Sequence, residues 1–145
     1  PIHDPHARGV FFGLNLTHTR ADLFRAVVEG IAAGTAHVLE TCAEVGASPD
    51  RVLAVGGGTK NALWLQATSD FGGIAQHVCD KTIGASYGDA FLAALAVGSV
   101  QPRDILTWNP NATTVHPETV PAYATQYRLW KRLYTQTRDL MQALP

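Results

Sequence analysis

Three consecutive glycines, residues 56–58, restrict the fold of this chain more than any other feature of its sequence. The residues before them, 51–55, read RVLAV, a short apolar run that is typical of a strand. Residues 60–73 follow with apolar positions at helical intervals and end in two glycines. Because glycine lacks Cβ, the triplet lets the backbone approach a ligand while the next helix directs its amide groups there. The pattern therefore predicts a strand, a glycine loop and a helix, and the loop suits an adenosine or a phosphate.

A long helix is predicted ahead of this unit. Thr19 and Asp22 have the spacing of a capping pair, and the helical pattern behind them extends to Gly46, a natural C-terminal stop. Gly30 and Gly34 lie inside this helix, where each costs about 1 kcal/mol relative to alanine. We therefore expect both glycines to allow a neighbouring element to pack closely.

The remaining segments continue the alternation of helices and strands. Residues 74–78 read as a second strand, and residues 83–97 as the start and body of a small-residue helix. Prolines, asparagines and threonines in residues 101–120 predict an irregular surface connection. Residues 121–145 predict an amphipathic helix with Pro121 in its first turn. The fold class is α/β, with short strands and packed helices.

Composition limits the kinds of partner that this chain is expected to have. Eleven basic and twelve acidic residues give a net charge of −1, which excludes a strong field for nucleic acid or anionic lipid. No apolar run approaches the length of about 20 residues that a membrane span requires. Cys42 and Cys79 lack metal or redox spacing, so we expect two free, buried thiols. Residues 1–5 contain no apolar targeting core, and the expected location is cytoplasmic.

The glycine loop by itself leaves several interpretations open. It is compatible with a tight turn that binds nothing. The phosphate-loop pattern GxxxxGK[ST] does not occur, and the dinucleotide pattern GxGxxG meets Asn61 where its last glycine belongs. An NAD-binding domain remains an alternative because Asp80 follows the next strand, where such folds place a ribose-binding acid. The long helix ahead of the first strand argues against that alternative.

Three segments, in one order, resemble the FGGY family of carbohydrate kinases, with a xylulokinase-like character. Residues 9–14 (GVFFGL), then seven residues, then residues 22–29 (DLFRAVVE) meet every defined position of the family's second signature. The glycine triplet resembles the adenosine segment, and Gly84 to Gly98 the glycine and alanine helix behind it. The positions that complete the adenosine segment are Asn61, Trp64, Gln66 and Asp70.

The resemblance implies an actin-like (ribonuclease H-like) ATPase fold of two domains, with ATP in the cleft between them. Residues 1–100 would be the C-terminal part of the nucleotide-binding domain, residues 101–120 the irregular connection and residues 121–145 its terminal helix. Gly57 and Gly58 would lie against the adenine or ribose, and Asn61 would hydrogen-bond the adenine edge. Gly56 would allow the turn, and Thr59 and Lys60 are near enough to contact the nucleotide.

The family's catalytic aspartate and phosphate loops belong ahead of the segment that matches this chain, so no catalytic residue is assigned here. We expect a part of a longer enzyme that uses MgATP to phosphorylate a ketopentose or a related sugar or polyol, and that is catalytically incomplete by itself. A stand-alone adenine-nucleotide-binding module that regulates is the alternative. No metal site is predicted, because His3, Asp4 and His6 lie in a mobile terminal stretch. A face meant for another domain makes homo-oligomers plausible.

Overall fold

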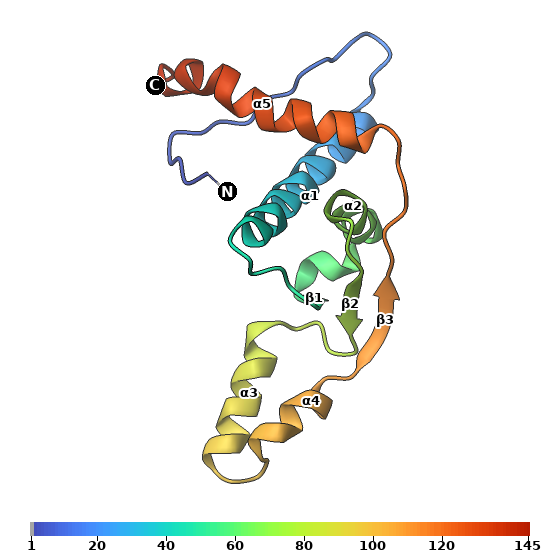
Figure 1. The fold of residues 1–145 in the computed structure, drawn as a ribbon, viewed down its shortest axis with the longest axis vertical. Coiled ribbons are helices and arrows are strands. Elements are labelled where there is room, and N and C mark those ends of the chain that lie inside the picture. Colours follow the sequence, from blue (N-terminus) through green and yellow to red (C-terminus); the bar gives the residue numbers. More distant parts are fainter. Residues whose placement is uncertain (1) are drawn as a thin grey trace.

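The computed structural model describes residues 2–145, so Pro1 of the N-terminal stretch lies outside the described residues. Figure 1 shows α1, α2 and α5 at one end of the molecule, α3 and α4 at the other, and a small sheet between them. Within residues 2–145, no helix has both the length and the apolar character needed to cross a bilayer. The helices are α1 (Arg20–Glu44), α2 (Ala62–Gly72), α3 (Ala85–Ala96), α4 (Ile105–Trp108) and α5 (Tyr123–Gln142); the strands are β1 (Val52–Ala54), β2 (Gln76–Cys79) and β3 (Asn111–Val115); and the 3₁₀ turns are η1 (Gly57–Lys60) and η2 (Pro102–Asp104).

Helix α1 begins and ends as its sequence predicts. The Thr19 backbone N–H donates to Asp22 Oδ2 at 2.7 Å, and the Asp22 N–H donates to Thr19 Oγ1 at 3.4 Å, which completes a capping box. The hydrogen bonds from Thr19 lower the pKa of Asp22. At the other end Gly46 has φ +73°, a conformation that favours glycine and stops the helix.

The core lies mainly between α1 and α2, which pack on each other more extensively than any other pair of elements. Small side chains fill this contact, so the two helices approach closely. Ala32 and Ser69 are completely buried, and Ala67 is almost so. Phe71, near the end of α2, stacks on the buried Tyr123 ring of α5 with centroids 4.0 Å apart.

Gly30 and Gly34 confirm the expected close approach of a neighbour. A Cβ at Gly30 would lie 3.8 Å from Trp130 Nε1, and a Cβ at Gly34 would lie 3.9 Å from Trp130 Cζ2. The indole of α5 therefore rests on both glycines. Further along the contact, Glu40 accepts hydrogen bonds from Tyr127 Oη at 2.7 Å and Lys131 Nζ at 2.9 Å. These two partners lower the pKa of Glu40.

The sheet has the order β1-β2-β3, in which β1 is parallel to β2 and β3 is antiparallel to β2. Residue Val52 pairs with Gln76, and Gln76 also pairs with Val115 on the other side. The prediction of an irregular connection over residues 101–120 is wrong, since this segment contains η2, α4 and β3. Residues typical of turns in and around β3 hid its strand character in the sequence. This five-residue strand is stabilised by its pairing with β2.

The structure also tests three smaller predictions. Helix α3 begins at Ala85, inside the residues 83–97 that were predicted to form it. Helix α5 begins at Tyr123, two residues after Pro121. Both cysteines are free as predicted, but only Cys79 is buried and Cys42 is half-buried.

Candidate functional site

The glycine loop lies at the carboxyl end of β1 and turns directly into η1. Gly56 has φ +84° and ψ −172°, a backbone conformation that a residue with a Cβ rarely adopts. The Thr59 backbone N–H and the Thr59 hydroxyl both donate to the Gly56 carbonyl, at 3.2 and 2.7 Å. The Thr59 hydroxyl therefore stabilises the loop from within, while Lys60 is exposed.

Two backbone amides at this turn are left without acceptors. Gly57 and Gly58 are the first two residues of η1, ahead of its first internal hydrogen bond, and no side chain caps the turn. Within residues 2–145 neither N–H has an acceptor. Gly57 is exposed, and a Cβ there would meet nothing within 4 Å. The loop therefore presents N–H donors to whatever approaches it.

A second glycine turn, which sequence reasoning did not include in the site, lies against the first. Gly84 precedes α3 with φ +85°, and a Cβ there would lie 3.7 Å from the Gly56 Cα. The Gly56 N–H donates to the Thr82 carbonyl at 2.9 Å, which links the two turns. The sequence could have indicated this second turn, because Gly84 follows the second parallel strand as Gly56 follows the first. Carboxyl ends of parallel strands meet at one sheet edge, where ligands of α/β proteins bind.

Among residues 2–145, no side chain caps the start of α3 either. Its first internal hydrogen bond runs from the Tyr87 N–H to the Gly84 carbonyl at 3.0 Å. The Ala85 and Ser86 amides precede that bond and have no acceptor in the part of the chain that the structure describes. Four free amide donors thus flank the contact between Gly56 and Gly84. Such donors, with a helix N-terminus behind them, suit an anionic or hydrogen-bond-accepting ligand.

Asn61 caps α2, a role that its sequence position did not reveal. Its Oδ1 accepts the Trp64 N–H at 3.1 Å. That bond uses the carbonyl side of the amide and leaves the Nδ2 group available as a donor. Asn61 is half-buried beside the glycine turn, and its cap bond does not use the Nδ2 group that the predicted adenine contact requires.

Trp64 sets the space around Gly58. A Cβ at Gly58 would lie 3.0 Å from Trp64 Cζ3 and 3.2 Å from Trp64 Cε3, closer than ordinary packing allows. A Cβ at residue 58 would therefore require the Trp64 ring to shift, so protein packing accounts for a glycine at this position. Gly57 has no such neighbour, so protein packing gives no reason for its lack of a side chain.

Gln66 and Asp70 serve the fold and not the loop. Gln66 Nε2 donates to Asp70 Oδ1 at 2.7 Å and to the His116 carbonyl at 2.9 Å. Asp70 Oδ1 also accepts the Glu118 N–H at 2.7 Å. These bonds fasten the segment after β3 onto α2. Two positions of the adenosine-like segment thus have a structural explanation.

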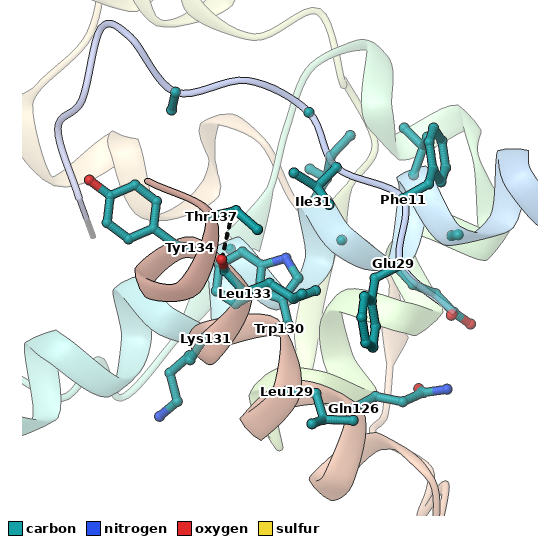
Figure 2. Close-up of a pocket in the computed structure, with 18 of the residues that line it drawn as sticks. Phe11, Glu29, Ile31, Gln126, Leu129, Trp130, Lys131, Leu133, Tyr134 and Thr137 are labelled. Carbon is teal, nitrogen blue, oxygen red and sulfur yellow. Dashed lines mark hydrogen bonds between the residues drawn. The ribbon is translucent and has the colours of Figure 1, made fainter. Parts of the chain in front are cut away.

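Two other candidate features lie outside this site. A half-open, mainly apolar cavity of about 1020 Å³ lies between the N-terminal segment, α1 and α5. Figure 2 shows Phe11, Ile31 and Trp130 around this cavity, one from each of those three segments. Because it contains none of the free amides, we retain the glycine turns as the candidate ligand site. Asp80 forms an exposed ion pair with Lys81 at 2.8 Å.

Comparison with known proteins identifies the family. The sequence profile of the FGGY family of carbohydrate kinases, C-terminal domain, matches residues 1–97. This chain belongs to the FGGY family. The xylulose kinase of Bacillus subtilis (strain 168) is 31% identical over 99% of the chain and 30% of its own length. Among solved structures, the xyloylose kinase from Brucella ovis has a TM-score of 0.84 and 30% identity, covering 97% of this chain and 30% of that one. The xylulose kinase from Rhodospirillum rubrum has a TM-score of 0.79 and 29% identity, covering 95% of this chain and 29% of that one.

These matches confirm the predicted family and the predicted α/β, actin-like fold class. The chain spans about 30% of the length of the curated relatives that it matches. Membership of this family, together with a β3 antiparallel to β2, argues against the NAD-binding alternative.

Proposed function

We propose that this chain is the adenine-nucleotide-binding part of an ATP-dependent carbohydrate kinase. One observation carries the proposal: two glycine turns at the ends of parallel strands are linked by the bond from the Gly56 N–H to the Thr82 carbonyl, and free backbone amides flank that link. Family membership supplies the reaction class, which is phosphoryl transfer to a sugar hydroxyl.

We propose one role for each of the groups at the two turns. Gly57, whose missing Cβ no protein neighbour explains, lets the adenine or ribose lie against the backbone. Asn61 Nδ2 donates to an acceptor on the adenine edge while Oδ1 continues to cap α2. The Ala85 and Ser86 amides at the start of α3 face the phosphate end, where the helix dipole favours negative charge.

The proposal also covers the sugar acceptor, the cellular location and the metal ion. Two of the compared proteins are named xylulose kinases, so we infer a ketopentose or a related polyol as the acceptor. Two free cysteines favour a cytoplasmic location. The described residues contain no group of three or more His, Cys, Asp or Glu side chains that could hold a metal ion. We therefore assign none of them as ligands of the Mg²⁺ that accompanies ATP.

The decisive experiment uses three substitutions at Asn61. Asn61→Asp and Asn61→Ser both keep an oxygen for the Trp64 N–H, so the cap of α2 survives, but both lose the amide donor. Asn61→Ala loses the cap as well, at about 1 kcal/mol of unfolding free energy. We expect all three to weaken ADP binding by about tenfold or more, equivalent to about 1.4 kcal/mol.

ADP is titrated by calorimetry, and tryptophan fluorescence gives a second readout because Trp64 adjoins the loop. Asn61→Ser is the neutral control for the charge that Asn61→Asp adds beside a phosphorylated ligand. ADP binding by Asn61→Ser as tight as that of the unaltered chain would remove Asn61 from the site. A parallel titration in which NAD binds more tightly than ADP or ATP would overturn the proposed function.

A further inference from the structure

Helices α3 and α4 join the sheet through two connections, one that leaves β2 and one that enters β3 (Figure 1). The first connection contains the second glycine turn, in which the Thr82 carbonyl accepts the Gly56 N–H at 2.9 Å. Gly84 in this turn has φ +85°, and a glycine backbone leaves such a conformation more readily than any other residue. The position of the Ala85 and Ser86 amides therefore depends on what holds the ends of the turn.

Asn109 holds the beginning of the second turn. Its Oδ1 accepts the Lys81 N–H at 2.9 Å, and its Nδ2 donates to the Lys81 carbonyl at 2.7 Å. The backbone pairing of β2 with β3 stops nearby, where the Asp80 N–H donates to the Pro110 carbonyl at 2.9 Å. Because proline has no backbone N–H, Pro110 cannot return a bond, and the Asn109 amide supplies both a donor and an acceptor beyond it. Lys81 is thereby fixed one residue before Thr82.

Trp108, the residue before Asn109, holds the end of the same turn. Its Nε1 donates to the Tyr87 carbonyl at 3.2 Å, and the Tyr87 hydroxyl donates to the Trp108 carbonyl at 3.2 Å. The two rings also pack on each other with centroids 5.5 Å apart, and the Trp108 ring meets the buried Phe91 edge-on at 5.3 Å. Two consecutive residues thus bind both ends of residues 81–87, with the free amides between those ends.

We propose that Trp108 and Asn109, here called the clamp, are positioning residues for the nucleotide. The clamp holds both ends of residues 81–87 and so keeps the Ala85 and Ser86 amides beside the glycine loop. Within residues 2–145, its side-chain hydrogen bonds all go to this segment and none goes to the glycine loop. The inference rests on the proposed function and deepens it, because it names the residues that set the affinity of the site for the phosphate end.

The test compares ADP with adenosine, which share the base and the ribose and differ in their phosphates. Adenosine is expected to use Gly57 and Asn61 of the glycine loop, whereas ADP also uses the amides of the second turn. We expect Asn109→Ala to weaken ADP binding by about tenfold, equivalent to about 1.4 kcal/mol, and to leave adenosine binding unchanged. Calorimetry measures the affinity for ADP, and an NMR titration measures the affinity for both ligands.

Asn15→Ala is the matched control for this variant. The Asn15 side chain also takes part in two hydrogen bonds, which it accepts from the Thr17 N–H at 2.9 Å and the Thr17 hydroxyl at 2.7 Å. These bonds lie in the N-terminal segment, away from both glycine turns, so the control should bind ADP and adenosine as the unaltered chain does. Urea unfolding establishes that both variants are folded before the titrations are compared.

The backbone amide signals in the NMR titration locate the effect within the site. In the unaltered chain, the signals of Ala85 and Ser86 should move with ADP and stay in place with adenosine, and the signal of Gly57 should move with both ligands. In Asn109→Ala, the change that ADP causes at Ala85 and Ser86 should shrink while the change at Gly57 persists. A purely structural role of Asn109 would not produce this selectivity.

Tyr87→Phe keeps the proposal testable if Asn109→Ala does not fold. This variant keeps the ring and removes only the hydroxyl that donates to Trp108, so ADP binding should weaken by about threefold with adenosine binding unchanged. Unchanged ADP affinity in either folded variant, or equal losses for ADP and adenosine, would overturn the clamp. An unaltered chain that binds neither ligand would overturn the proposed function, and this inference with it.

Discussion

The end of the molecule formed by α1, α2 and α5, here called the helical end, differs from the two glycine turns in how its polar groups are hydrogen-bonded. Between α1 and α5, polar side chains from distant parts of the sequence bind one another: the Tyr123 hydroxyl donates to Glu29 at 2.8 Å, and Lys131 donates to Glu40. At the turns, four backbone N–H groups have no acceptor within residues 2–145, and no side chain of these residues caps them. The difference indicates that the helical end supplies stability and that the turns, held by that end, are free to bind.

The largest expected effect on stability comes from removing the Tyr123 side chain. Its ring is buried against Phe71, so Tyr123→Ala should lower the unfolding free energy by about 3 kcal/mol, as for other aromatic side chains lost from a core. Tyr123→Phe keeps the stacking and loses only the bond to Glu29, at about 1 kcal/mol. Urea unfolding measures both. Folded Tyr123→Ala should bind ADP normally, and a selective loss of binding would show that the two regions are not separate.

A second prediction sharpens the comparison within one turn. Gly58→Ala should lower the unfolding free energy by about 1–3 kcal/mol, because the new Cβ would press on the Trp64 ring. Gly57→Ala meets only open space and should change stability by no more than about 0.5 kcal/mol. If the ligand approaches Gly57, this second variant should nevertheless bind ADP less tightly. A Gly57→Ala variant with the same stability and the same ADP affinity as the unaltered chain would argue against a ligand at that residue.

The smallest expected effect concerns pH at the helical end. Hydrogen bonds from Tyr127 and Lys131 lower the pKa of Glu40, so its contribution is present above the ordinary value of 4.5 and is lost as pH falls through the lowered pKa. Because the pair is partly exposed, Glu40→Gln should cost only about 0.5 kcal/mol near neutral pH. The difference between variant and unaltered chain should shrink in acid and in high salt. A difference that is constant with pH would show that the carboxylate is not responsible.

The elements that local sequence describes well are those that local forces determine. The Thr19 and Asp22 capping box and the stop at Gly46 are contacts between near neighbours, and both were predictable. Strand β3 was not, because its order depends on pairing with β2 and on the bond from Ser69 Oγ to the Val115 carbonyl at 3.1 Å. Its threonines, asparagines and flanking prolines resemble those of a loop when read without these partners.

The same division applies to the candidate site. The sequence by itself determined the family, the glycine turn after β1 and the helix behind it, since these depend on residue types at short spacing. Only the tertiary structure decided that Gly84 lies against Gly56, that the Trp64 ring lies over Gly58, and that Gln66 and Asp70 hold the chain after β3. The physical reason is that these contacts join segments brought together by the parallel pairing of β1 with β2 and by helix packing, which no local pattern records.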